Sequence, residues 1–147
     1  MAAIRRAQAV WQGDLASGSG KVSAATSGAF TDLPVTWASR TETADGRTSP
    51  EELIAAAHAA CYCMALSSEL ARAGAPAARL EVSATVTFDR VDGKWTVAKS
   101  DLQVAGRVPG ISAEAFRDLA GAAKDGCPVS RALAGNVAIS VEPALEA

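Results

Sequence analysis

The sequence predicts an α+β fold, formed by a single domain over residues 1–147. Three observations support this prediction. The length suits one domain, strand patterns and helix patterns fall in separate blocks, and the hydrophobic period changes sharply near residue 49. The blocks run in the order three strands, a helix, two strands, a helix and a strand. Strands and helices that segregate in this way are typical of α+β domains.

The first block predicts a small sheet. Residues 7–13 and 21–26 are strand-like runs, and the Gly-Ser stretch at 17–20 between them indicates a hairpin connection. A third strand is predicted over residues 34–40. The polar segment 41–49 is predicted to be a loop, because its Asp-Gly pair is typical of a turn.

A helix signal follows. Ser49 is a capping residue, Pro50 suits the first helical position, and two acids occupy the first turn. The helix should run to about Ala73, where Gly74 ends it. We expect this helix to be buried and central, because its many small side chains require close packing from several sides. The residues predicted to share one face are Leu53, Ile54, Ala57, Cys61, Met64, Ala65 and Ser68.

The remaining blocks are also well marked. Apolar and polar residues alternate over 82–89, Asp92-Gly93 is a strong hairpin signal, and a long returning strand is predicted over 94–108. Its length allows a bulge. The other predicted elements are a helix over 112–124, a short helical turn that begins at Cys127-Pro128, and a last strand over 136–142.

Composition excludes several classes of protein. The net charge is −2 and the sequence pI is ≈ 5.4, which argues against a nucleic-acid-binding protein. No apolar run approaches about 18 residues, so we expect no membrane span. The N-terminus lacks the apolar segment of a secretory signal. An odd number of cysteines without such a signal predicts the reducing cytosol rather than a disulfide scaffold.

The cysteines are the first candidates for chemistry. Cys61 lies in the middle of the long helix, where it is either a small core residue or a reactive thiolate that needs a cation nearby. Cys63 cannot easily pair with it, because positions two apart do not face each other on a helix. Cys127 opens a short helix, where the N-terminus lowers the pKa of a thiol; the alternative is a buried turn residue. A thioredoxin-like oxidoreductase is disfavoured, because the chain has no Cys-x-x-Cys.

His58 is the only histidine and can share a helix face with Cys61. We interpret it as a packed residue bonded to a neighbouring carbonyl rather than as a base. Zinc is disfavoured, because the histidine and the three cysteines lack the spacing of a structural zinc site. The sequence therefore predicts neither a metal nor a cofactor.

Two long motifs resemble one family. The segment Ser-Pro-Glu-Glu-Leu-Ile-Ala-Ala-Ala-His-Ala-Ala-Cys at 49–61 is similar to the central-helix motif of the OsmC/Ohr thiol-dependent hydroperoxide reductases. The segment Gly-Cys-Pro-Val-Ser at 126–130 resembles the second motif of that family, in the form of its OsmC branch. The opening Trp-Gln-Gly-Asp at 11–14 and the Asp-Gly hairpin at 92–93 are also similar, so the resemblance spans almost the whole chain.

The resemblance implies an intertwined homodimer, with β-sheets wrapped around the long helix and active sites built from both chains. It implies that Cys61 is the peroxidatic cysteine and Cys127 the resolving one. It also implies that Glu51 and an arginine before the helix prepare the Cys61 thiolate. Arg40 matches the family pattern best, and Arg47 in the same loop is the alternative. Cys63 departs from the pattern, since a serine or another small residue is usual there.

The function expected from these observations is that of a cytoplasmic peroxidase without a cofactor. It would reduce organic hydroperoxides to alcohols and would be recycled by a small dithiol or lipoyl-type reductant, with no nucleic-acid or membrane partner. The alternative hypothesis is a non-catalytic protein of the same fold that binds an apolar ligand between protomers. The pKa of Cys61 distinguishes the two hypotheses, because a peroxidase needs a Cys61 thiolate and a binding protein does not.

Overall fold

The computed structural model describes residues 1–147 and confirms the α+β class. The chain divides into two compact units, Met1–Leu53 and Ile54–Ala147. The boundary falls inside the long helix α2 (Pro50–Arg72), which begins in the first unit and continues through the second. The organisation of the whole chain as one functional domain remains a prediction.

The first unit is built on an antiparallel sheet in the order β1-β2-β3. Its strands are β1 (Gln8–Gln12), β2 (Ser19–Ser23) and β3 (Leu33–Val35). The predicted hairpin between the first two strands is confirmed. Gly20 faces Trp11 in this hairpin, and a Cβ at Gly20 would lie 2.7 Å from the carbonyl oxygen of Val10, so only glycine fits there.

The predicted third strand over 34–40 is wrong beyond Val35. Thr36 instead caps a short helix, α1 (Trp37–Thr41). The Thr36 hydroxyl accepts a hydrogen bond from the Ser39 backbone N–H, and the Thr36 N–H donates to the Ser39 hydroxyl, both at 3.0 Å. This reciprocal capping box satisfies two backbone N–H donors, those of Thr36 and Ser39. It also turns the chain out of the extended conformation.

The predicted long helix is confirmed at both ends. The Glu52 backbone N–H donates to the Ser49 hydroxyl at 3.1 Å, and Gly74 leaves the helix at φ 76°. The predicted inward face, however, is wrong, because Met64 is 67% exposed. The buried stripe of the second unit holds the bulkier side chains, which recur every four residues: His58, Tyr62, Leu66 and Leu70.

The second unit contains a three-stranded sheet in the order β4-β5-β6. The antiparallel strands β4 (Arg79–Val91) and β5 (Lys94–Arg107) form the predicted hairpin, in which both Asp92 and Gly93 have positive φ. The register shifts between Thr87 and Phe88, which confirms the predicted bulge. The last strand, β6 (Ala138–Leu145), pairs parallel to β5.

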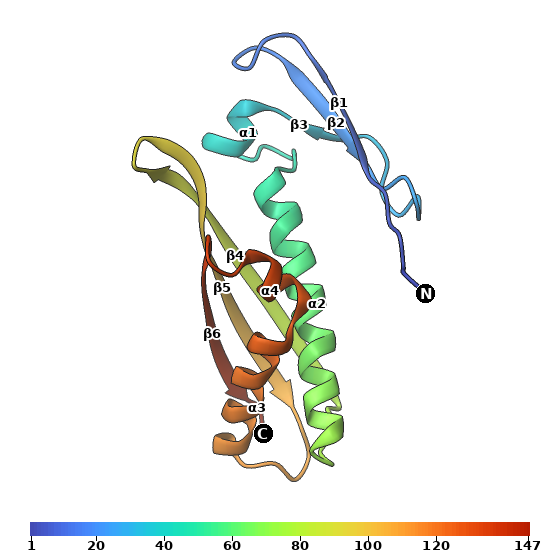
Figure 1. Cartoon of the computed structure of the whole chain (residues 1–147), viewed down its shortest axis with the longest axis vertical. Coiled ribbons are helices and arrows are strands. Elements are labelled where there is room, and N and C mark those ends of the chain that lie inside the picture. Colours follow the sequence, from blue (N-terminus) through green and yellow to red (C-terminus); the bar gives the residue numbers. More distant parts are fainter. The chain divides into compact units, whose positions relative to one another are not determined.

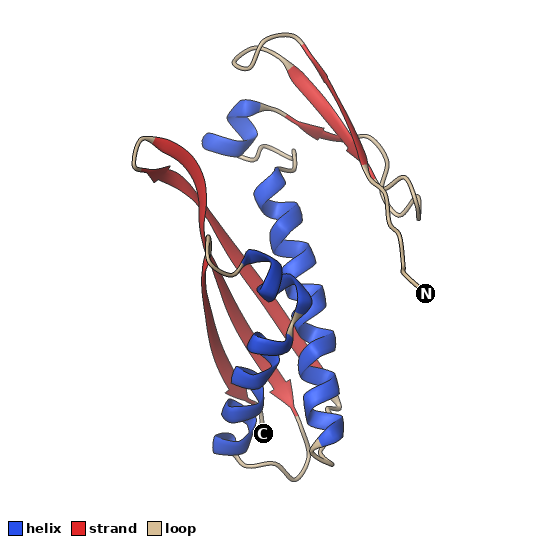
Figure 2. Cartoon of the chain, viewed as in Figure 1, coloured by secondary structure: helices blue, strands red, loops and turns tan.

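Three helices lie on one face of this sheet: α2, α3 (Ala113–Gly126) and α4 (Pro128–Leu133) (Figures 1 and 2). The core between helices and sheet is dominated by Tyr62, Leu66 and Leu70 of α2, Leu102 and Val104 of β5, and Phe116 of α3. Gly106 of β5 makes room for this packing, since a Cβ there would lie 2.4 Å from the Phe116 ring. The close contact of α3 with β5 therefore depends on glycine.

Helix α2 is also long and apolar enough to cross a membrane when judged by length and composition alone. Core helices of water-soluble proteins satisfy the same criterion. Here its stripe of bulky side chains packs against the β4-β5-β6 sheet and α3.

Candidate active site

Cys61 and Cys127 come from different elements and interact directly. Cys61 is half-buried in the middle of α2, and Cys127 is fully buried at the junction of α3 and α4. Neither forms a disulfide. Each thiol shifts the pKa of the other, so the structure brings together the two cysteines that the sequence singled out from positions 66 residues apart.

The surroundings of the two sulfurs shift their pKa values in opposite directions, upward for Cys61 and downward for Cys127. Burial raises the pKa of Cys61, and donation of its proton to Cys127 adds to this effect. Burial acts on Cys127 as well, but the backbone N–H and the hydroxyl of Ser130, together with Cys61, lower the pKa of Cys127 overall. The backbone of Val129, which like Ser130 lies in the first turn of α4, also lowers the pKa of Cys127.

Cys61 also borders an open pocket of ≈ 330 Å³. Its other lining residues are Met64, Ala65, Ser68, Glu69, Arg72, Gly126 and Pro128. Cys63 borders a different hollow, beside residues 77–80. Burial raises the pKa of Cys63, and the backbone of Val82 opposes this shift only in part. The two neighbouring thiols of α2 therefore face different surroundings.

Arg40 and Glu51 form an ion pair within the first unit. The Arg40 Nε donates to both carboxylate oxygens of Glu51, at 2.9 and 3.1 Å, and Nη2 donates at 2.8 Å. Glu51 is only 6% exposed, and the guanidinium also lies over the Trp37 ring at 5.7 Å. A planar guanidinium held in this way has a fixed orientation.

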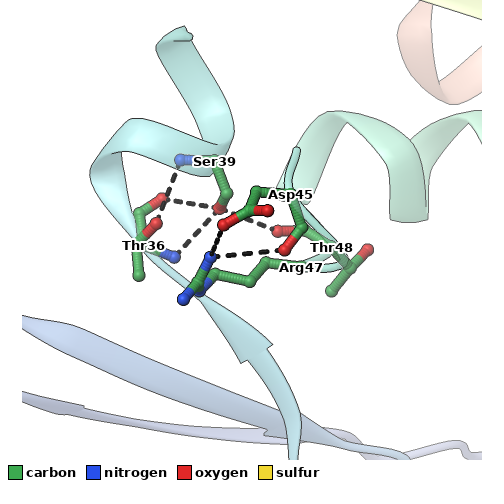
Figure 3. Close-up of polar contacts among 5 residues, drawn as sticks. All are labelled: Thr36, Ser39, Asp45, Arg47 and Thr48. Carbon is green, nitrogen blue, oxygen red and sulfur yellow. Dashed lines mark hydrogen bonds and ion pairs between the residues drawn. The ribbon is translucent and has the colours of Figure 1, made fainter. Parts of the chain in front are cut away.

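Arg47, the alternative candidate, has a different partner. Its Nη1 donates to the Asp45 carboxylate at 2.8 Å and to the Asp45 carbonyl oxygen at 3.3 Å, within an exposed turn (Figure 3). Of the two arginines, only Arg40 is joined to Glu51. The roles of Arg40 and Glu51 in catalysis remain predictions.

His58 is completely buried and bonded on both sides of its ring. Nδ1 lies 2.6 Å from the Ser100 hydroxyl on β5, and Nε2 lies 2.7 Å from the Ser130 hydroxyl on α4. The expectation of a packed histidine is confirmed, but its partners are hydroxyls rather than a carbonyl. Sequence reasoning missed both serines. Ser130 had one available signal, its position three residues after Cys127, whereas Ser100 had none, because only the sheet brings it to His58.

These bonds also bear on metal binding. A metal ligand must offer a ring nitrogen, but serines engage both nitrogens of His58. No group of three or more His, Cys, Asp and Glu side chains in residues 1–147 is arranged to hold a metal ion.

Comparisons with known proteins agree with this architecture. Residues 43–142 match the family described as OsmC-like protein. The chain is 40% identical over 138 residues to peroxiredoxin OsmC of Escherichia coli (strain K12), a match that covers 94% of this chain and 95% of that protein. It is 33% identical over 115 residues to the organic hydroperoxide resistance protein OhrA of Bacillus subtilis (strain 168), covering 77% and 79%.

A solved structure shares the fold. An organic hydroperoxide resistance protein from Elizabethkingia anophelis aligns with a TM-score of 0.75 and 24% identity over 99% of this chain and 100% of its own. The fold is therefore that of the hydroperoxide resistance proteins. Together with the domain match and the 40% identity, it shows that the chain belongs to the OsmC family, as its two cysteine motifs predict.

The buried histidine predicts a pH dependence of stability. Burial lowers the pKa of His58 from its ordinary value of 6.5, so the unfolded chain binds this proton at a higher pH than the folded chain. The contribution of His58 to the free energy of unfolding is then fully present above about pH 6.5. It declines as the pH falls from there to the lower pKa of the folded state. We expect urea titrations to show a loss of up to about 1.4 kcal/mol per pH unit in this window. His58→Gln, which cannot titrate, should flatten the curve there; equal slopes in both proteins would contradict the prediction.

Proposed function

We propose that this protein is a peroxidase that reduces organic hydroperoxides to alcohols, with Cys61 as the peroxidatic and Cys127 as the resolving thiol. The observation that carries the proposal is the direct interaction of two unpaired thiols from α2 and α4. Membership of a family whose named relatives are a peroxiredoxin and an organic hydroperoxide resistance protein supports it. Three unpaired cysteines also suit the reducing cytosol.

The reaction has three steps. The Cys61 thiolate attacks the peroxide and takes one oxygen to become a sulfenic acid, while the other oxygen leaves and is protonated to the alcohol. Cys127 then attacks the sulfenic sulfur, so that a disulfide forms and water is released. A small dithiol, such as a lipoyl group, exchanges with this disulfide, restores both thiols and is itself oxidised to a disulfide. No metal or other cofactor takes part.

The first step requires a cation close to Cys61. Burial raises the pKa of this thiol, and none of the groups that shift it is positively charged. We assign the missing charge to Arg40, of the same chain or of a partner, with Glu51 fixing the guanidinium. The two-pronged ion pair between Arg40 and the buried Glu51 supports this choice over Arg47, which is bound to an exposed aspartate.

We also propose that two chains form a homodimer. All the buried apolar side chains of the core lie between Tyr62 and Cys127, in the second unit, so the first unit has no apolar core of its own. Its sheet leaves Val10 62% and Trp11 42% exposed, and α2 leaves Met64 67% exposed. A three-stranded sheet needs a buried apolar face for stability. A second copy of the chain would cover these surfaces and would supply an apolar environment that favours alkyl hydroperoxides.

The cysteines give the first test. Cys61→Ser should abolish the reduction of cumene hydroperoxide with dihydrolipoamide in a coupled assay, because the attacking sulfur is lost. Cys127→Ser should still consume the first equivalent of peroxide to form sulfenic acid at Cys61, and further equivalents should over-oxidise Cys61 to sulfinic acid, detected by mass spectrometry. Cys63→Ser is the matched control on the same helix and should turn over normally. Peroxidase activity that survives in Cys61→Ser, or unreacted thiols in the wild-type protein, would favour the ligand-binding alternative.

The arginine assignment is tested through the pKa of Cys61. Arg40→Met should raise the pKa that governs alkylation of Cys61, measured in a Cys63→Ser, Cys127→Ser background, by about 1 unit or more, because a neighbouring cation stabilises the thiolate. Peroxide reduction should fall in parallel. Arg47→Met removes the same charge from the turn that follows α1 and serves as the control. If Arg47→Met has the larger effect, the two assignments must be exchanged.

The homodimer is tested by light scattering after size-exclusion chromatography. The wild-type chain of 14.9 kDa should elute with twice that mass at micromolar concentration. Met64→Glu should shift the protein toward the monomer, because it buries a charge in the proposed interface. Val91→Glu, at a residue 44% exposed in the β4–β5 hairpin, provides a comparable change elsewhere. A monomeric wild-type protein would contradict the proposal.

A further inference from the structure

Three buried polar side chains, Ser100, His58 and Ser130, are hydrogen-bonded in a row. They have no part in the reaction outlined above. Ser100, His58 and Ser130 are 0%, 0% and 4% exposed, and the two links between them measure 2.6 and 2.7 Å. They come from β5, α2 and α4. Three polar side chains joined by short bonds in an apolar core are costly to bury unless every bond is made.

This row of side chains ends at Ser130, close to Cys127 in the sequence. Ser130 lies in the first turn of α4, three residues after Cys127, and both its backbone N–H and its hydroxyl act on the Cys127 sulfur. A path of polar groups therefore runs from the His58 Nε2 through the Ser130 hydroxyl to the sulfur.

The partners of His58 allow its proton to move. A carbonyl beside a ring nitrogen would lock that nitrogen as a donor, but a hydroxyl can either donate or accept. Because hydroxyls flank both nitrogens, the ring can exchange tautomers or take up a second proton without losing either bond. A histidine with a purely structural role does not need this freedom.

We propose that Ser130 and His58 form a proton relay that accepts the proton of Cys127 while the Cys61–Cys127 disulfide forms. The inference rests on the proposed function and adds two residues to it. In this proposal Ser130 is a catalytic residue, because it lies in the helical turn that Cys127 caps and would take the proton directly from the reacting sulfur. His58 is a positioning residue that acts through Ser130.

During disulfide formation, the Cys127 thiol gives its proton to the Ser130 hydroxyl, which passes its own proton to the His58 Nε2. The Cys127 sulfur attacks the sulfenic sulfur of Cys61, the S–S bond forms and the S–O bond breaks. His58 returns the proton through Ser130 to the departing hydroxide, which becomes water. Overall, a sulfenic acid and a thiol give a disulfide and water: Cys127 is oxidised, Cys61 is reduced, and the relay is unchanged.

Other titrating and charged groups also lie near the relay. Lys124 and Asp125 of α3 and Arg131 of α4 line a pocket of ≈ 310 Å³ together with Ser130. Val137, which precedes β6, and Ile139 of β6 also line this pocket, and their side chains do not titrate. His58, unlike these three side chains, is hydrogen-bonded to Ser130.

On the α2 side, the groups near Cys127 are Cys61 and Tyr62. Tyr62 stays protonated, because burial raises its pKa and its hydroxyl donates to the Ala120 carbonyl oxygen at 2.7 Å. Glu69, which approaches Gly126, is paired with Arg72. His58 is therefore the bonded base on this path whose ordinary pKa lies near neutrality.

The test follows the second chemical step by itself. Reduced full-length protein is mixed with one equivalent of cumene hydroperoxide and quenched with acid at intervals. Mass spectrometry then counts sulfenic acid and disulfide across about pH 6 to 9, a range that spans ordinary histidine and thiol pKa values. The quantity compared is the rate of disulfide formation relative to the rate of sulfenic acid formation in the same sample.

Four variants define the relay. Ser130→Ala removes the link to the sulfur and Ser130→Thr keeps the hydroxyl. His58→Gln keeps a bonded polar side chain that cannot titrate. Ser100→Ala removes a hydroxyl from the far side of the same ring and controls for loss of a buried hydrogen bond. Circular dichroism verifies that each variant folds.

We expect Ser130→Ala and His58→Gln to slow disulfide formation at neutral pH by about tenfold or more, the range of general-base effects. Both should recover as the pH rises toward about 8.5, where a thiol ionises unaided. Ser130→Thr should restore most of the rate, and Ser100→Ala should keep the wild-type pH profile. If Ser130→Ala does not fold, Ser130→Thr and His58→Gln still decide the question.

Two outcomes would overturn the relay alone. One is a wild-type rate and pH profile in His58→Gln and Ser130→Ala. The other is an equal slowing in Ser130→Ala and Ser100→Ala with an unchanged pH profile, which would indicate a structural role. If the wild-type Cys61 forms no sulfenic acid at all, the proposed function itself fails, and the relay fails with it.

Discussion

The two hydrogen bonds of His58 are the constraint on which the rest of the second unit depends. Through one buried ring they join α2 to β5 and to α4, at 2.6 and 2.7 Å. Because Ser130 and Cys127 share the same turn, the bond that fixes Ser130 also sets the position of Cys127 against α2. Cys61 lies three residues after His58 on that helix. Together with the apolar core around Tyr62, Leu66 and Phe116, these two buried bonds hold in place the elements that carry the two thiols.

The same burial creates an electrostatic problem. Taking the thiols out of water disfavours their charged forms, and a reactive thiolate needs compensation. Cys127 receives it from the dipoles of the α4 turn, whereas Cys61 receives no positive charge from its surroundings in the second unit. The ion pair of Arg40 and Glu51, which belongs to the first unit, is the charge that the proposed mechanism brings to Cys61. The proposed mechanism thus combines a thiol of the second unit with an ion pair of the first unit, of the same chain or of a partner.

Local patterns predicted the elements well and their faces less well. The start and end of α2, the Asp-Gly hairpin and the α3 helix all follow from signals within a few residues, whereas the bulge was expected only from the length of the strand over 94–108. The predicted strand over 34–40 failed, because a capping box at Thr36 and Ser39 outweighs the strand propensity around it. The prediction of which face of α2 is buried was wrong for another reason. Alanine contributes little to periodicity, so the bulkier stripe that includes Tyr62, Leu66 and Leu70 decides which side is buried.

The α+β class, the family and the two candidate cysteines can be predicted from the amino-acid sequence, because they depend on local periodicity and on motifs that are contiguous in the chain. The side chains that surround these cysteines are known only from the folded chain. Arg40 rather than Arg47 is bonded to Glu51, and Ser100 and Ser130 enclose His58. Ser100 lies 42 residues from His58 and Ser130 lies 72. Contacts at such separations arise from sheet register and helix packing, which bring together residues that no local pattern connects.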